Sequence, residues 1–256
     1  MKNKLILLVV CILLSLCTTV FAETTVPILM YHNINPSYTS DRALVEMTQD
    51  EFKEQIIALL KNGYTPISLY DYKDWVNGEK SLPEKPVIIT FDDGYLNNYT
   101  HAFPIIKELN VPVTIFVITG RMGMSDGVVY PHFTWEQAIE MENSGLVDIE
   151  SHTNLHSDFH FADQKSIILE LRLSKYLFKK HMNKDVEFLA YPYGHFNELV
   201  QAEAEKAGYS ACVKTDNTEL SANKKDTDVY ALKRITACGG MTGDELIRQI
   251  EYSKTR

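Results

Sequence analysis

The chain has 256 residues, 45% of them hydrophobic, which is enough apolar material for one well-buried domain. Its formal net charge is −9 at pH 7, which argues against nucleic acid as a partner, because binding a polyanion requires a basic surface. The sequence contains no Ser/Gly-rich linker, repeat or low-complexity tract. We therefore expect a single domain over residues 23–256.

The first 22 residues have the pattern of an export signal. Lys2 and Lys4 precede an apolar run over residues 5–16, and residues 20–22 (VFA) resemble a small-x-small cleavage site. The run is shorter than the ~20 residues that a membrane-spanning helix needs. We expect cleavage after residue 22 and a secreted or periplasmic protein. The alternative is that the N-terminal segment is not cleaved and anchors the protein to a membrane.

Short apolar runs typical of buried strands alternate with helix patterns along the chain. Thr48, Thr134 and Thr242 each stand three residues before a Glu or Gln, the spacing of a capping box. Asp163 and Asn197 can cap two further helices. A polar loop is expected over residues 33–41. The predicted strands cover residues 26–31, 64–69, 87–89, 113–119, 147–150, 186–191, 209–215 and 229–236. The predicted helices cover residues 48–63, 69–76, 98–109, 134–145, 163–183 and 197–207, with a last one from residue 242.

This alternation predicts a parallel sheet with helical crossovers, and both an open doubly wound sheet and a closed barrel fit it. Polar residues follow four of the predicted strands at their carboxyl ends. An open sheet gathers its ligands at one switch point, whereas a barrel brings many strand ends around one site. The barrel is therefore favoured. The polar residues are His32, Asp92, Asp93, His152, His156, Tyr193 and Gly194.

Asp93, His152 and His156 form a candidate metal site. The two histidines are four residues apart, a spacing that places both imidazoles on one face of a helical turn. The residue after His152 is not Glu, so the pattern is not the H-E-x-x-H helix of metalloproteases. Three protein ligands that leave one coordination position open are typical of a catalytic zinc site. Incidental surface histidines are the alternative interpretation.

The neighbouring residues predict a hydrolytic reaction. A metal ion can make water acidic near neutral pH, and Asp92 is the free carboxylate that can accept the proton. The backbone N–H of Tyr193 can stabilise negative charge on the attacked carbonyl, although a plain turn is the alternative. His32 is the candidate general acid for an amine leaving group, with a structural His as the alternative. Arg234 can hold Asp92 ionised by charge pairing, or be a solvated or structural Arg.

Three motifs in this order resemble the first three motifs of the polysaccharide deacetylases, the chitooligosaccharide-deacetylase-like carbohydrate esterases of family four. They are residues 90–94 (TFDDG), 151–156 (SHTNLH) and 191–194 (YPYG). The resemblance covers nearly all of residues 23–256. It implies a distorted (β/α) barrel, usually of seven parallel strands, and a divalent metal, most commonly zinc, with cobalt or nickel as alternatives.

The resemblance also implies roles for individual residues. Asp92 matches the catalytic base, and Tyr193 matches the oxyanion-hole residue. The metal ligands match Asp93, His152 and His156.

Two features depart from the family pattern. Leu189 and Ala190 stand where the family has an Arg that pairs with the base, and no His follows His195, so the late Leu-x-His motif that brings the general acid is missing. Residues 29–32 (LMYH) resemble the start of the poly-N-acetylglucosamine deacetylase branch, in which an early His serves as the acid. This supports His32 as the acid and leaves Arg234 as a stand-in for the missing Arg.

We therefore expect an N-deacetylase of an acetylated extracellular glycan such as poly-N-acetylglucosamine, a chitin-like polymer or peptidoglycan, yielding a free amine and acetate. The alternative is an O-acetyl esterase acting on a polysaccharide such as xylan, because an ester depends less on a general acid. A carbohydrate-binding protein with an inactive site ranks lower, because the residues that would bind the metal and act as the base are all present. A non-haem iron oxygenase also uses two His and one carboxylate, but the strand–helix alternation disfavours it. Cys212 and Cys238 either pair or stay as separate thiols.

Overall fold

The computed structural model describes residues 24–38, 45–125, 130–215 and 220–256. The predicted export segment, residues 1–22, lies outside them, so its cleavage stays a prediction. Across the described ranges, none of the helices combines the length and the apolar character needed to span a bilayer.

Seven parallel strands form one curled sheet, a half-barrel in a single domain. Across the sheet they run β10 (Ile235–Thr236), β1 (Ile28–Tyr31), β5 (Pro86–Phe91), β6 (Val113–Val117), β7 (Val147–Ser151), β8 (Phe188–Ala190) and β9 (Ala211–Val213). An additional short strand, β4 (Thr65–Pro66), pairs with β5. An isolated bridge between Val213 and Leu232 links β9 to the segment that leads into β10. The expected distorted barrel of seven parallel strands is confirmed.

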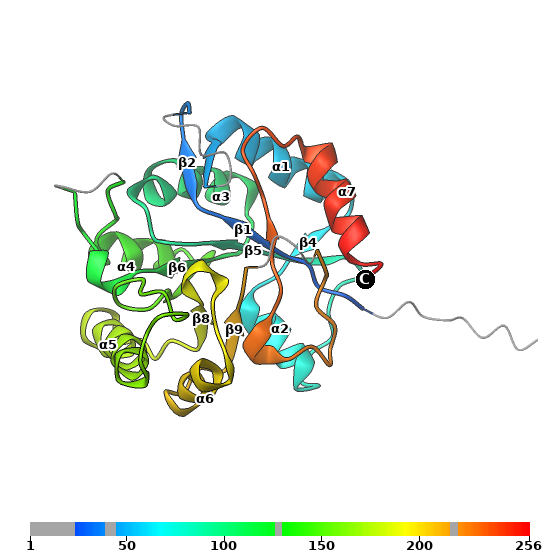
Figure 1. The fold of residues 1–256 in the computed structure, drawn as a ribbon. Helices are drawn as coiled ribbons and strands as arrows, with labels where there is room; N and C mark the ends of the chain where they lie inside the picture. The colour runs from blue at the N-terminus through cyan, green and yellow to red at the C-terminus, as the bar shows by residue number, and fades with distance from the viewer. Residues whose placement is uncertain (1–23, 39–44, 126–129, 216–219) are drawn as a thin grey trace, which may run out of the picture.

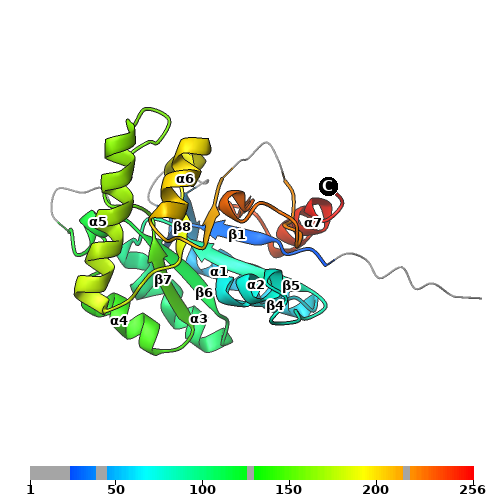
Figure 2. The same cartoon turned by 90° about the horizontal axis from the view of Figure 1, so that it is seen from below.

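Helices cover both faces of this sheet (Figures 1 and 2). The larger core lies between one face and the helices α1 (Gln49–Lys61), α3 (Phe103–Leu109), α4 (Trp135–Asn143), α5 (Gln164–Met182), α6 (Glu198–Lys206) and α7 (Gly243–Ser253). On the other face, Ile88 and Phe116 pack in a smaller core with α2 (Leu69–Val76). Because successive strand residues point to opposite faces and both faces are covered, the strands read as continuous apolar runs.

The helix starts agree closely with the sequence prediction. Thr48, Thr134 and Thr242 form capping boxes with Glu51, Gln137 and Glu245. The Asp163 and Asn197 side chains accept backbone N–H groups at the starts of α5 and α6. These caps satisfy N–H groups that the first helical turn leaves without partners.

Several predicted elements are wrong in length or type. The strand expected over residues 229–236 is a 3-10 turn, Val229–Ala231, followed by the two-residue β10. Part of the expected loop is β2 (Asn33–Asn35), which pairs in parallel with β3 (Glu46–Thr48). Residues 98–102 form a π-helical turn before α3. Cys212 and Cys238 are both free thiols, so the paired alternative is not realised in the structure.

Candidate active site

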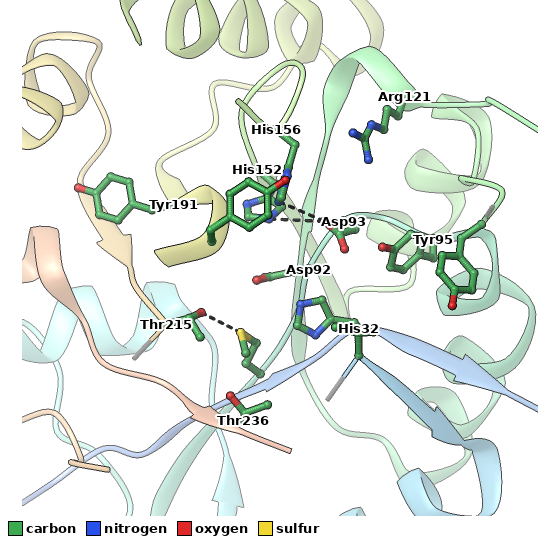
Figure 3. Close-up of a pocket in the computed structure, with 14 residues that line it drawn as sticks. His32, Asp92, Asp93, Tyr95, Arg121, His152, His156, Tyr191, Thr215 and Thr236 are labelled. Atoms are coloured by element: carbon green, nitrogen blue, oxygen red, sulfur yellow. Dashed lines mark hydrogen bonds and ion pairs between the residues drawn. The ribbon is translucent and has the colours of Figure 1, made fainter. Parts of the chain in front are cut away.

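The carboxyl ends of the parallel strands surround one cavity of about 420 Å³. Figure 3 shows side chains from separate strand ends converging there. Six of the seven predicted site residues line it, and the seventh, Arg234, contacts Asp92. The lining residues are His32, Asp92, Asp93, His152, His156 and Tyr193.

Asp93, His152 and His156 meet in an arrangement that fits a metal ion. The Nε2 atoms of His152 and His156 each lie 3.6 Å from Asp93 Oδ1. Ligands held about 2.1 Å from a tetrahedral zinc ion lie about 3.4 Å apart. The His152 Nδ1 atom is 2.8 Å from the backbone oxygen of Ala190, which fixes the ring with Nε2 facing Asp93. A carboxylate and two oriented imidazoles form a donor set that suits a divalent cation.

A sharp turn directs the two adjacent carboxylates to different partners. Asp93 has a φ of 73° and Gly94 a φ of 78°, the left-handed region that glycine adopts readily. A Cβ on Gly94 would lie 2.9 Å from Val117 Cγ1, so the close approach to β6 also requires glycine. The turn points Asp93 toward the histidines (Figure 3). Asp92 instead pairs with Arg234.

Asp92 is held by a buried, bidentate ion pair. The Arg234 Nη1 and Nη2 atoms donate to its two carboxylate oxygens over 2.7 and 2.6 Å. Arg234 also donates to Thr90 Oγ1, Thr215 Oγ1 and the Lys214 carbonyl oxygen. Burial alone would raise the pKa of Asp92, but the charge of Arg234, with that of His152, holds this pKa well below its usual value. Asp92 is therefore ionised at neutral pH.

The segment that carries His156 differs from the helical turn that the spacing suggested. Residues 152–157 form an irregular loop in which Thr153 and His156 have φ values of 65° and 63°. The buried Glu170 of α5 supports this loop: its carboxylate accepts the N–H groups of Asn154 and Leu155 and the hydroxyl of Ser157. The two imidazoles converge through positive-φ residues and this carboxylate, and the helical expectation was wrong.

His32 directly follows β1 and borders the cavity near Asp92 (Figure 3). Its Nδ1 atom is buried and has no hydrogen-bond partner among the described residues. Burial lowers the pKa of His32, and the charges of Asp92 and Asp93 oppose that shift. The His32 side chain therefore lines the cavity and has one ring nitrogen without a hydrogen-bond partner among the described residues.

Tyr193 lies in the 3-10 turn Pro192–Gly194 after β8, with a φ of 58°. Gly194 follows with a φ of 71°, and a Cβ there would clash with the Thr215 carbonyl oxygen, so the turn can approach the segment after β9 only with glycine. The Tyr193 ring is 60% exposed and packs against the His156 ring at 4.6 Å. This turn places Tyr193 beside His156, one of the candidate metal ligands.

Known proteins resemble this chain over most of its length. The family model for polysaccharide deacetylase matches residues 79–212. The chain belongs to the polysaccharide deacetylase family. The Bacillus subtilis (strain 168) protein YxkH is 34% identical over 228 residues, covering 89% of this chain and 77% of that protein. The poly-beta-1,6-N-acetyl-D-glucosamine N-deacetylase of Escherichia coli (strain K12) is 27% identical over 235 residues, but the match covers only 35% of that protein and 77% of this chain.

Solved structures agree with this assignment to the polysaccharide deacetylases. The Streptococcus pyogenes deacetylase PplD, solved with acetate, superposes with a TM-score of 0.79 at 25% identity, over 89% of this chain and 99% of that one. IcaB from Ammonifex degensii superposes with a TM-score of 0.73 at 26% identity, over 91% and 97% of the two chains.

Sequence reasoning missed three residues of the site. Tyr95 and Arg121 line the cavity, and the Tyr95 hydroxyl interacts with the Asp93 carboxylate, lowering the pKa of Asp93 alongside the larger effects of burial and the histidines. Glu170 is the third residue, and its carboxylate holds the His156 loop by hydrogen bonds. Tyr95 and Arg121 each follow a strand end closely, so the rule that found the other residues could have found them. Glu170 lies within a helix, where no local pattern marks it.

Proposed function

We propose that this polysaccharide deacetylase hydrolyses N-acetyl groups on an extracellular polysaccharide that contains N-acetylglucosamine, yielding a free amine and acetate. The observation that carries the proposal is the Asp93–His152–His156 cluster beside an ionised Asp92 in one cavity. The names of the Escherichia coli relative and of similar proteins from Staphylococcus aureus support poly-N-acetylglucosamine as the first substrate to test. Chitin-like polymers and peptidoglycan are the other members of this substrate class.

Asp93, His152 and His156 would hold a divalent cation, and zinc suits this donor set best. When bound, such an ion lowers the pKa of water and polarises a carbonyl oxygen. Asp92 then accepts the proton of the attacking water. Its bidentate bond to Arg234 keeps this carboxylate charged and fixes its orientation.

Tyr193 and His32 would serve the remaining steps. The Tyr193 backbone N–H can donate to the acetamide oxygen as negative charge develops there. His32 delivers a proton to the departing nitrogen, because an amine leaves poorly without one. Arg234 acts through Asp92 in place of the Arg that the third motif lacks.

The export pattern over residues 1–22 supports a secreted or periplasmic enzyme that meets its glycan outside the cytoplasm. The net charge of −9 supports a glycan and not nucleic acid as the partner.

Acetate release from a panel of substrates tests the proposal. The panel contains poly-N-acetylglucosamine, chitooligosaccharides, peptidoglycan fragments and acetylated xylan, each incubated with and without a chelator. We expect chelator-sensitive release from at least one N-acetylated glycan. Release from xylan alone, or turnover that survives complete metal removal, would contradict it.

The His32→Ala variant separates amide hydrolysis from ester hydrolysis. We expect a loss of about 100-fold or more on the amide, the usual contribution of a general acid, and a smaller loss on an aryl acetate. A loss on the amide no larger than the loss on the aryl acetate would contradict the acid role of His32.

A further inference from the structure

A row of aromatic rings leads from the metal site to the protein surface. The His156 ring contacts the Tyr193 ring at 4.6 Å, and Tyr193 lies 6.1 Å from the His195 ring. His195 lies 5.7 Å from the His160 ring, which in turn contacts Phe161 at 4.8 Å. We call the four exposed members, Tyr193, His195, His160 and Phe161, the ring track.

The ring track is unusually open to solvent. Phe161 is 82% exposed, the highest value among the large hydrophobic side chains of the described residues, and Tyr193 is 60% exposed. Leaving an aromatic side chain of this size in water forgoes the free energy of its burial. Exposed apolar surface that continues from a cavity is typical of a ligand-binding surface.

Two loops are tied together beneath the track. The Asp158 carboxylate lies 2.8 Å from His195 Nδ1 and accepts the backbone N–H of His160 over 2.9 Å. The Phe161 N–H donates to the Asp158 carbonyl oxygen, and the neighbouring Phe159 anchors the loop in the core. The loop after β7 and the turn after β8 therefore present their rings as one preorganised surface, which reduces the entropy lost on binding.

The chemistry of the track suits a sugar chain. A pyranose ring has an apolar C–H face that stacks on an aromatic ring, while its hydroxyl groups need polar partners at the edges. Phe161 and Tyr193 offer ring faces, and His160 and His195 offer ring nitrogens. Since Tyr193 also lines the cavity, the track continues from the place where the acetyl group would react.

We propose that the ring track is a binding subsite for sugar units that lie beyond the reacting unit on the same polysaccharide. This inference rests on the proposed function and adds to it which surface binds the neighbouring sugar units, and that the enzyme discriminates by chain length. Phe161 does not line the cavity, so we expect a short oligomer held there to depend on Phe161 less than a long one does.

The test compares kcat/KM for acetate release from a dimer and a hexamer of N-acetylglucosamine in wild type and in Phe161→Ala. We expect a roughly three- to tenfold loss on the hexamer, the range set by the energy of one aromatic stacking contact, and an unchanged value on the dimer. Tyr176→Ala is the matched control, because Tyr176 is an exposed aromatic of α5 outside the track. Equal losses on both substrates, or none, would overturn the inference.

Calorimetric binding of the hexamer to metal-stripped wild type and Phe161→Ala separates this inference from the proposed function. If wild type releases no acetate from any glycan, the proposed function fails, while weaker hexamer binding by the stripped variant would still support the track. Equal hexamer binding by both proteins would overturn the track. So would Phe161-dependent binding to phosphatidylglycerol vesicles with unchanged hexamer binding, which would assign the rings to a membrane surface.

Discussion

The buried ion pair between Arg234 and Asp92 allows a quantitative test of how the site is held. Arg234→Met removes the charge and both donors from Asp92, which is 3% exposed. Breaking a buried pair by removing one partner costs about 3–5 kcal/mol, because the remaining charge is left uncompensated. We expect a loss of that size in the free energy of unfolding at pH 7.

The pH of this measurement follows from the sign of the pKa shift. The folded-state pKa of Asp92 lies below its usual value, so the stabilisation is present above the unfolded-state pKa of about 3.9. It is lost as the pH falls through the folded-state pKa. At pH 7 the whole contribution is measured.

A double-mutant cycle completes the test. Asp92→Asn should cost less than Arg234→Met, because Arg234 keeps its bonds to Thr90, Thr215 and the Lys214 carbonyl oxygen. The double variant buries no unpaired charge at either position. We expect it to be about 1–3 kcal/mol more stable than the sum of the two single losses predicts.

Urea unfolding followed by circular dichroism, with a chelator in every sample, gives the four free energies without a contribution from bound metal. The exposed pair between Lys53 and Glu108 is the matched control. The same cycle with Lys53→Met and Glu108→Gln should give a coupling below about 1 kcal/mol. Losses at Arg234 and Asp92 that simply add would refute the reasoning.

Three further predictions concern the supporting residues. Glu170→Gln should weaken zinc binding about 10-fold or more, measured by competition with a chelating dye. Glu203→Gln, which changes a buried Glu of α6, should leave the zinc affinity unchanged. Equal affinities for wild type and both variants would show that Glu170 does not support the metal site. Burial lowers the pKa of His132 to about 4, so the stability gained from the neutral His132 is present above about pH 6.5 and is lost as the pH falls toward 4. Across this range the free energy of unfolding should fall more steeply for wild type than for His132→Phe. If the two free energies fall in parallel, the pKa of His132 is not lowered. Gly94→Ala should lower the thermal midpoint more than Gly145→Ala does. Both glycines have positive φ, but of the two only Gly94 would bring the new Cβ within 3.0 Å of a neighbour. Similar midpoints for the two variants would show that Val117 moves aside without a loss of stability.

The parts of the fold that depend on local chemistry could be predicted from the sequence. Capping boxes at Thr48, Thr134 and Thr242 involve residues three apart, so one short stretch contains the whole motif. The strands can also be recognised in the sequence as continuous apolar runs, because both faces of the sheet are covered. These two signals located the helix starts and the carboxyl ends of the strands, where the predicted site residues lie.

The parts that depend on distant partners could not be predicted as well. β2 contains two Asn residues, which are poor strand formers, and it becomes a strand only because β3 pairs with it. The seven residues of α3 directly continue a π-helical turn, a change of hydrogen-bond register that residue spacing does not reveal. Glu170 supports the His156 loop from a helix that begins after that loop ends. Arg234 stands 142 residues from Asp92. The opposite charges of the two residues therefore predicted the pair, but the sequence did not reveal its bidentate geometry.

Metal content measured on the purified protein after exhaustive dialysis against buffered zinc tests the central claim most directly. We predict about one zinc ion per chain for wild type and for Tyr176→Ala, and a clear loss of zinc in the His152→Ala and His156→Ala variants. Zinc that stays at the wild-type ratio after both histidines are replaced would contradict the assignment of this site.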